Sequence, residues 1–184
     1  MNAFKEKEYI TRTLQGEQQA FACLVNHYKD KVFALAFRIM RQRELAEEVT
    51  QDIFVKVFQH LTSFKENAAF STWLYRIAYN TSISAIRKRK IVGQPLDESF
   101  LLSLKDNSEE NETEELIMKK LNELINALPS EEAALITLFY HHDKSMEEIG
   151  QITGQSLANI KVKIHRIRNK LREQLKGALH YETL

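Results

Sequence analysis

The sequence predicts an all-α protein in which two small helical domains, an N-terminal helical bundle and a C-terminal helix-turn-helix, are joined by a flexible acidic linker. Two prolines and five glycines in 184 residues are too few for the many turns of an all-β chain. Apolar residues recur at helical spacing on both sides of one interruption, which is rich in Gly, Pro, Ser, Asn and acids. We therefore expect domains over residues 1–90 and 116–184, with the linker over residues 91–115.

Three amphipathic helices are expected in the N-terminal domain. Apolar residues hold one face over about five turns of residues 21–39, a second set repeats every four residues over 45–61, and a third stripe covers 74–85. Cys23 falls within the apolar run of the first helix, so we expect a small buried side chain there. As the single cysteine it rules out an internal disulfide.

Helix boundaries are marked in the sequence of the C-terminal domain. Its first helix stops at Pro129, and Ser130 is expected to cap the next one. Ser145 and Glu148 have the spacing of a capping box, and Gly154 suits a left-handed turn. A short helix, a glycine turn and a second, longer helix make a helix-turn-helix.

The longer helix of this motif, which Ser156 is expected to cap, has a polar outer face opposite Ile160, Ile164 and Ile167. Such a helix belongs in a major groove, where most cations contact phosphates and only a few side chains reach base edges. The alternative is a plain solvated helical hairpin. The candidate DNA contacts are Ser156, Asn159, Lys161, Val162, Lys163, His165, Arg166 and Lys170. Among them, the candidates for base-edge contact are Lys161, Val162, His165 and Arg166.

Charge is segregated along the chain, although the net charge is only +1. Residues 61–90 carry six Lys or Arg against one acid, residues 91–115 carry eight acids against one Lys, and residues 155–184 carry seven basic against two acidic residues. This order predicts two units that face nucleic acid, separated by a segment that nucleic acid repels.

An aromatic and basic segment over residues 70–90 indicates contact with unpaired bases. Phe70, Trp73, Tyr75 and Tyr79 lie within ten residues, and the segment ends in four cations. Flat rings beside phosphate-neutralising charge can hold unstacked bases. A lone helical Trp more often packs in a core, so packing is the first expectation for Trp73.

One face of the same segment is better placed to contact a DNA strand. Arg76, Asn80, Ser84 and Arg87 are three or four residues apart, so they lie on one side of a helix. Lys88 belongs to the terminal basic run, which would contact phosphates.

Other classes of protein are disfavoured. No run of about 18 apolar residues and no signal-peptide core is present, so we expect a cytoplasmic protein without membrane insertion. His141 and His142 are adjacent but lack a third ligand at helical spacing, so we expect no metal, and no cofactor either. The acids lie in the linker or on helix faces, which disfavours a nuclease or another enzyme. A dimeric helix-turn-helix regulator is an alternative, but it leaves residues 70–90 unexplained.

Three segments together resemble the extracytoplasmic-function (ECF) group of bacterial RNA polymerase sigma factors. They are residues 47–54 (EEVTQDIF), residues 70–78 (FSTWLYRIA) and the Leu128-Pro129 pair ahead of the helix-turn-helix. The resemblance implies a non-catalytic factor that binds core RNA polymerase, recognises the −10 and −35 promoter elements in duplex and melted DNA, and supports DNA opening. Such factors are often held inactive by an anti-sigma factor, which is therefore an expected partner.

The resemblance also implies roles for matched residues. Helix 45–58 would dock on the coiled coil of the polymerase clamp, and the alternative is an ordinary acidic solvated face. The residues expected to dock are Glu47, Glu48, Gln51 and Asp52.

In similar sigma factors, loop 61–70 and the helix after it capture a base flipped from the −10 strand. Asn80 matches the position that bonds this base, and its amide has both donors and acceptors. Ala158, Asn159 and Val162 depart from the usual residues of the −35 reader, so no promoter sequence is predicted. Phe64 and Phe70 would wall the pocket of this base or belong to the core. The expected −10 contacts are Phe64, Phe70, Trp73, Arg76, Asn80, Ser84, Arg87 and Lys88.

Overall fold

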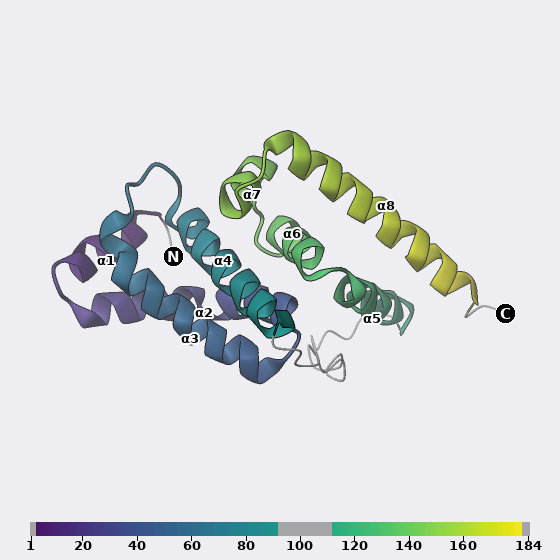
Figure 1. The fold of residues 1–184 in the computed structure, drawn as a ribbon, viewed down its shortest axis with the longest axis horizontal. Coiled ribbons are helices and arrows are strands. Elements are labelled where there is room, and N and C mark those ends of the chain that lie inside the picture. Colours follow the sequence, from purple (N-terminus) through teal and green to yellow (C-terminus); the bar gives the residue numbers. More distant parts are fainter. Residues whose placement is uncertain (1–2, 92–111, 182–184) are drawn as a thin grey trace.

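The structure, a computed structural model, describes residues 3–91 and 112–181, and every regular element in these two ranges is a helix (Figure 1). The predicted fold class is therefore confirmed. The elements are α1 (Ala3–Leu14), α2 (Gln18–Met40), α3 (Arg43–His60), the 3₁₀ turn η1 (Leu61–Ser63), α4 (Phe70–Ile91), α5 (Glu112–Ala127), α6 (Ser130–Tyr140), α7 (Met146–Thr153) and α8 (Leu157–Tyr181).

The N-terminal bundle forms around the long helix α2. Its buried residues recur three or four apart from Ala20 to Leu35, which directs one stripe at α3 and α4. The sequence did not predict α1, because its charged residues hide a short apolar face. Ile10 on that face is buried in the core, and Arg12 joins the end of α1 to Glu17 at 2.5 Å.

The expected burial of Cys23 is wrong, because its side chain is exposed. Ala20, Leu24 and Tyr28 point into the core at four-residue spacing. Cys23 is one residue before Leu24, and one residue turns a helix by about 100°, so the thiol lies off the buried stripe.

The C-terminal domain confirms most of the predicted helix boundaries. Ser145 and Glu148 form the reciprocal capping box of α7, Gly154 ends that helix at φ 72°, and the Ser156 hydroxyl accepts the Asn159 N–H at 3.3 Å. The expected Ser130 cap is wrong. Pro129 occupies the N-cap of α6, and the Ser130 hydroxyl instead donates to the Ile39 carbonyl of α2 at 3.1 Å.

The two domains pack against each other across α4. This helix contacts α2 and α3 on one side and α6 and α7 on the other, and α2 also contacts α6 (Figure 1). Buried apolar residues of both domains form one continuous cluster. The described helices extend to Ile91 and resume at Glu112, so both ends of the expected linker are helical, and its residues 92–111 lie outside the described ranges.

Candidate functional site

The outer face of α3 presents the four predicted docking residues to solvent. Ala46, Val49, Ile53 and Val57 are buried on the inner side of this helix. Their spacing leaves the opposite side for polar residues. Of the four, Glu47 forms an ion pair with Arg43 at 2.9 Å, and the other three form none within the described part of the chain. The exposed residues are Glu47, Glu48, Gln51 and Asp52.

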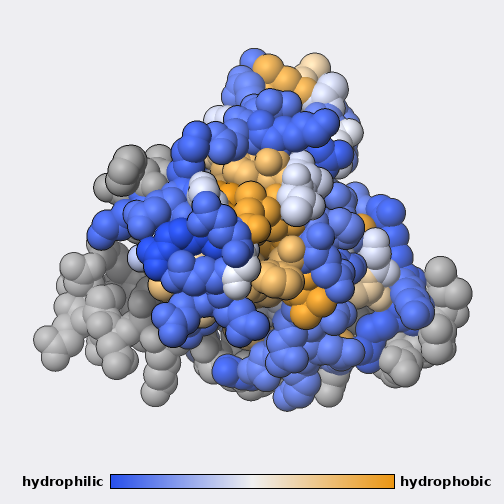
Figure 2. All heavy atoms as spheres, turned by 90° about the vertical axis from the view of Figure 1, so that its left-hand side faces the viewer, coloured by the Kyte–Doolittle hydropathy of each residue, from blue (hydrophilic) through white to orange (hydrophobic). Residues whose placement is uncertain are grey.

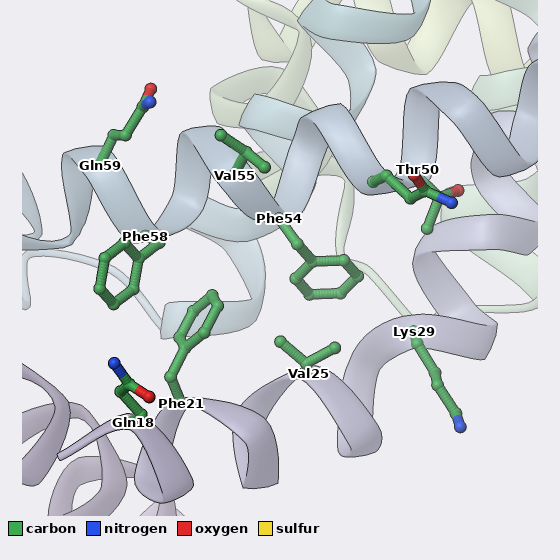
Figure 3. Close-up of a pocket in the computed structure, with 10 residues that line it drawn as sticks. Gln18, Phe21, Val25, Lys29, Thr50, Phe54, Val55, Phe58 and Gln59 are labelled. Atoms are coloured by element: carbon green, nitrogen blue, oxygen red, sulfur yellow. The ribbon is translucent and has the colours of Figure 1, made fainter.

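Beside this acidic face, α2 and α3 enclose an apolar groove of about 630 Å³. Phe21 and Val25 on α2 face Phe54 and Phe58 on α3, and the Phe21 and Phe58 rings meet edge to face at 5.0 Å (Figure 3). Polar residues lie at both ends of the groove. Its other lining residues are Gln18, Lys29, Thr50, Gln51, Val55 and Gln59.

The groove leaves large apolar side chains in contact with water. Val55 is 55% exposed and Phe58 is 52% exposed. The end of the molecule at α1 also shows apolar surface at the centre of a hydrophilic face (Figure 2). Clustered apolar exposure of this kind marks an interaction site more often than a solvated face. No pattern in the sequence predicts this site, because the groove exists only when α2 and α3 lie side by side.

A polar face of α4 is also exposed. The structure brings the side chains predicted to contact a DNA strand onto this face, as their spacing requires. Arg87 additionally forms an ion pair with Glu131 of α6 at 2.7 Å, so one member of the face contacts the other domain. The exposed members are Arg76, Asn80, Ser84, Arg87 and Lys88.

The aromatic rings of α4 do not form an open stacking surface in this structure. Phe70 is only 2% exposed and packs against Tyr28, Phe64 and Trp73, with ring centroids 5.5 to 5.7 Å apart. Of the two interpretations considered for Phe70, the structure therefore supports core packing. Phe64 and Trp73 are half-buried, which places them at the rim of this cluster.

Tyr75 and Tyr79 are buried as well, so the expectation that they face unpaired bases does not hold in this arrangement. Burial and, to a smaller extent, the Glu131 carboxylate raise the pKa of Tyr79 to about 12, while Arg87 opposes the shift. Both rings lie where α6 and α7 cover α4, a contact that helical periodicity cannot reveal.

The helix α8 has a buried apolar side and a solvent-exposed polar side, as predicted. Ile160, Ile164 and Ile167 are buried, and the opposite side carries the candidate DNA contacts. Asn159 donates to the Gln155 side chain at 3.1 Å, and the His165 ring lies 3.0 Å from the Asn169 amide. Lys163 is half-buried and the other candidates are exposed, namely Ser156, Asn159, Lys161, Val162, His165, Arg166 and Lys170.

A buried cation lies at the contact between α4 and α7. Lys144 is only 9% exposed, and its ammonium donates to the Ser71 hydroxyl at 2.7 Å and the Glu148 carboxylate at 2.8 Å. The Thr72 hydroxyl donates to the same carboxylate oxygen at 2.7 Å. The Lys144 ammonium also lies 5.7 Å from the Tyr75 ring centroid. The sequence gives no sign of this cluster, because Ser71 and Thr72 are more than 70 residues from Lys144 and Glu148.

His142 stacks on Tyr75 beside this cluster, with ring centroids 4.8 Å apart. Neither ring nitrogen finds a hydrogen-bond partner among the described residues. Burial, followed by the positive charges of His141, Lys31 and Lys144, lowers the pKa of His142 to about 4, while Asp143 opposes the shift. The ring is therefore neutral at neutral pH.

This burial predicts that the free energy of unfolding falls by about 1–3 kcal/mol as the pH is lowered from about 6.5 to about 4. An unfolded imidazole takes up its proton near pH 6.5, whereas the buried ring does so near pH 4, so the unfolded chain binds more protons across this window. The full difference corresponds to about 3.4 kcal/mol, and the partial exposure of the ring reduces it.

Urea unfolding at several pH values measures this effect. His142→Phe keeps a ring against Tyr75 and is expected to flatten the pH dependence. A His142→Phe protein with the wild-type slope would contradict the prediction.

Two further properties concern the described residues. Within residues 3–91 and 112–181 no group of three or more His, Cys, Asp or Glu side chains is arranged to hold a metal ion. No helix in these ranges is long and apolar enough to cross a membrane.

Comparison with known proteins identifies the two helical domains. Residues 24–91 match sigma-70 region 2, and residues 118–171 match sigma-70 region 4. Together these matches cover the bundle with the α3 and α4 surfaces and the helix-turn-helix with the α8 surface. The fold and its surfaces thus define a two-domain, promoter-recognising transcription factor of the sigma-70 type.

Relatives over nearly the whole chain make the family specific. The chain is 33% identical over 191 residues to the ECF RNA polymerase sigma factor SigW of Bacillus subtilis (strain 168), covering 92% of this chain and 96% of that protein. It is 30% identical over 166 residues to the ECF RNA polymerase sigma factor SigE of Mycolicibacterium smegmatis, covering 87% and 64% respectively. The chain belongs to the ECF family of RNA polymerase sigma factors, and it recognises promoters and initiates transcription.

A solved structure supports the fold. The sigma factor RpoE of Bartonella quintana, crystallised with the anti-sigma factor NepR, superimposes with a TM-score of 0.71 at 23% identity, covering 85% of this chain and 96% of that one.

Proposed function

We propose that this sigma factor docks on core RNA polymerase through the outer face of α3 and the groove between α2 and α3. The observation that carries the proposal is that exposed Val55 and Phe58 share one helix with the acidic side chains Glu47, Glu48 and Asp52. A partner with an apolar ridge and flanking basic residues would cover both parts. The coiled coil of the polymerase clamp, which the family resemblance implies, is the expected partner, because helices lie naturally in apolar grooves.

The apolar part alone would not hold the complex. Covering Val55 and Phe58 contributes roughly 2–4 kcal/mol at about 25 cal/mol per Å², whereas a micromolar complex needs about 8 kcal/mol. The acidic residues and the remaining contacts must supply the difference and orient the partner.

Co-elution with purified core polymerase, without promoter DNA, tests the proposal. A stable complex is expected. A chain that binds promoter duplex but forms no complex with polymerase would instead behave as a free-standing helix-turn-helix regulator.

We also propose that the polar face of α4 holds the −10 strand and so supports DNA opening. Arg76, Arg87 and Lys88 are positioned to neutralise phosphates of one strand, and the exposed Asn80 amide can bond the edge of an unpaired base. The binding energy of the captured base offsets the cost of unstacking it. Phe64 and Trp73, half-buried at the start of α4, are the aromatic side chains best placed beside such a base. Phe70 would act indirectly, by supporting them from the core.

Asn80→Ala is expected to reduce promoter opening about 10- to 100-fold while duplex binding by α8 survives, because one base contact is worth about 1–3 kcal/mol. Asn80 is exposed, so the fold should not change. Permanganate reactivity of the −10 region in the polymerase complex measures opening, and binding of the free chain to a −35 duplex measures the other activity. Asn26→Ala, at an exposed position of α2, is the matched control. Equal loss of both activities would remove Asn80 from this role.

The exposed side of α8 would read the −35 element in the major groove. Its cations, among them Lys161, Arg166 and Lys170, would contact phosphates, while Val162 and His165 are candidates for the groove floor. The chain would act without catalysis of its own, in the cytoplasm with the polymerase. Since the structurally similar RpoE was crystallised with an anti-sigma factor, we also propose that an anti-sigma factor holds this chain inactive.

A further inference from the structure

The loop between η1 and α4, residues 64–69, is held from outside by the N-terminal helix α1. This helix contacts η1, and it lies at the same end of the bundle as the loop (Figure 1). The match to sigma-70 region 2 begins at residue 24, so α1 lies outside the residues that this match covers. The contacts of α1 nevertheless converge on the aromatic side chains that we place beside the unpaired base.

The first contact fixes the middle of the loop. Glu66 has a φ of 55°, in the left-handed region that costs a residue with a side chain free energy. Such a conformation persists where surrounding contacts impose it, and it occurs often at binding sites. The Lys7 ammonium of α1 donates to the Glu66 carboxylate at 2.8 Å, although the two residues are 59 positions apart in the sequence. The ion pair therefore ties the strained residue of the loop to α1.

This ion pair acts on the conformation of the loop more than on the stability of the fold. The Lys7 side chain is 68% exposed and that of Glu66 is 55% exposed, and an exposed ion pair stabilises a fold little. Surface loops change conformation at a small cost in free energy, so even a weak contact can decide which conformation such a loop adopts.

The second contact supports the end of the loop through a buried ring. The Tyr28 hydroxyl donates to the carboxylate of Glu6 in α1. The Tyr28 ring meets the Phe70 ring edge to face, with centroids 5.7 Å apart. Phe70 in turn contacts Phe64 and Trp73, with ring centroids 5.5 and 5.7 Å apart. Two adjacent side chains of α1 therefore reach both the middle of the loop and its aromatic end.

The helix α1 can act as a support because it is itself fixed to the bundle. Ile10 is buried in the core. The Arg12 guanidinium pairs with Glu8 at 3.1 Å and with Glu17, at the start of α2, at 2.5 Å. These contacts hold α1 against α2, so the position of α1 is transmitted to the loop.

We propose that α1 is a positioning element for base capture. The Lys7–Glu66 ion pair sets the conformation of the loop, and Glu6 supports its aromatic end through Tyr28, so that the half-buried rings at the rim stand beside the unpaired base. The inference rests on the proposed holding of the −10 strand by α4. It adds residues that do not touch DNA but determine how strongly the base, as distinct from the phosphates, is bound.

Removal of single bases from the DNA separates base capture from phosphate contact. The probe is a labelled single-stranded oligonucleotide that carries the −10 element, together with copies that have an abasic site at each position in turn. Each is bound to the complex of the full chain with core polymerase. The ratio of the abasic to the intact dissociation constant measures what a base contributes, and it is largest for the captured base. A general charge effect changes both constants alike and cancels in this ratio.

Charge reversal on either side of the ion pair is expected to lower the ratio for the captured base. Lys7→Glu and Glu66→Lys each place like charges opposite each other, and each should lower it about three- to fivefold. The double variant has the wild-type net charge and an ion pair of reversed polarity, so it should restore the ratio. Both residues are exposed, so urea unfolding midpoints should stay close to that of the wild type.

The control breaks an ion pair in the other domain. Lys120→Glu makes the same charge change as Lys7→Glu and disrupts the pair of Lys120 with Glu123 in α5, which are 3.1 Å apart. It should keep the wild-type ratio.

The same measurement distinguishes failure of this inference from failure of the proposed −10 contact. Wild-type ratios in both single variants, or a ratio that the double variant does not restore, would overturn the role of α1. An unchanged ratio in Asn80→Ala would instead remove Asn80 from base contact and would leave the result for α1 standing. A ratio near one at every position in the wild type would overturn both, because no base is then captured.

Discussion

Replacing both Glu48 and Asp52 by Lys is expected to abolish co-elution with core polymerase, with an affinity loss of at least about a hundredfold. Both carboxylates are exposed on α3, one turn apart. A basic partner surface would meet two cations in place of two anions, and like charges in an interface cost several kcal/mol. A hundredfold loss corresponds to about 2.7 kcal/mol. Because neither residue is buried, circular dichroism and the unfolding midpoint should stay close to those of the wild type.

The matched control changes the net charge by the same amount elsewhere. Asp30→Lys with Glu173→Lys reverses two exposed acids, one on the solvent side of α2 and one on α8. This variant should bind polymerase like the wild type. Equal losses in the two double variants would indicate a general charge effect and would argue against α3 as the docking element.

Phe58→Ala separates the apolar part of the same interface from the charges. About half of the Phe58 surface is exposed and its main aromatic contact is Phe21. Truncation should therefore change stability little and weaken polymerase binding about tenfold or more. Wild-type affinity in this variant would leave the acidic face, without the groove, as the docking surface.

Local signals in the sequence were sufficient for most of the helices and caps. The Ser145–Glu148 box and the turn at Gly154 involve residues at most three or four apart, so the chain specifies them without tertiary contacts. The exposed faces of α4 and α8 follow from the same spacing rule. For that reason the candidate DNA contacts on these helices, except for the aromatic ones, lie where the sequence places them.

Apart from Cys23, which lies off the buried stripe of its own helix, the errors share one cause, which is packing between segments far apart in the sequence. Serine is a residue type that commonly caps helices, but the Ser130 hydroxyl contacts the end of α2 instead. Tyr75 and Tyr79 have aromatic rings that could stack on bases, but α6 and α7 cover them. Neither the buried Lys144 nor the α2–α3 groove has a local signature. Contacts between distant segments, at the domain interface and between α2 and α3, are thus the part of the molecule that the sequence does not predict.

The helix α4 shows why this interface matters for function. Its inner side completes the core with α2 and α3, its first turn contacts Lys144 of the other domain, and its exposed side carries the expected strand contacts. Arg87 belongs to two of these groups, since it pairs with Glu131 across the interface. Contact of Arg87 with a phosphate would therefore compete directly with its ion pair to Glu131.

Gly150→Ala is expected to destabilise the helix-turn-helix by about 1–3 kcal/mol, although Gly→Ala within a helix ordinarily stabilises it. A Cβ at position 150 would lie 2.8 Å from the Gln155 carbonyl oxygen, closer than a carbon and an oxygen can approach. The Gln155 N–H donates to the Gly150 carbonyl at 3.1 Å, so the turn cannot move away without losing this bond. Any shift also moves Ser156, which caps α8, and we expect binding to a −35 duplex to fall at least about tenfold.

Gly177→Ala is a control for which we expect the opposite change in stability. Gly177 lies inside α8, and a Cβ there meets nothing within 4 Å. The variant should gain about 0.5–1 kcal/mol, because alanine loses less backbone entropy in a helix than glycine does. Urea unfolding of both variants should therefore show midpoints shifted in opposite directions. A stabilised Gly150→Ala protein with normal duplex binding would mean that the turn tolerates the added carbon, and that the close approach of α7 to Gln155 does not fix the orientation of the DNA-reading helix.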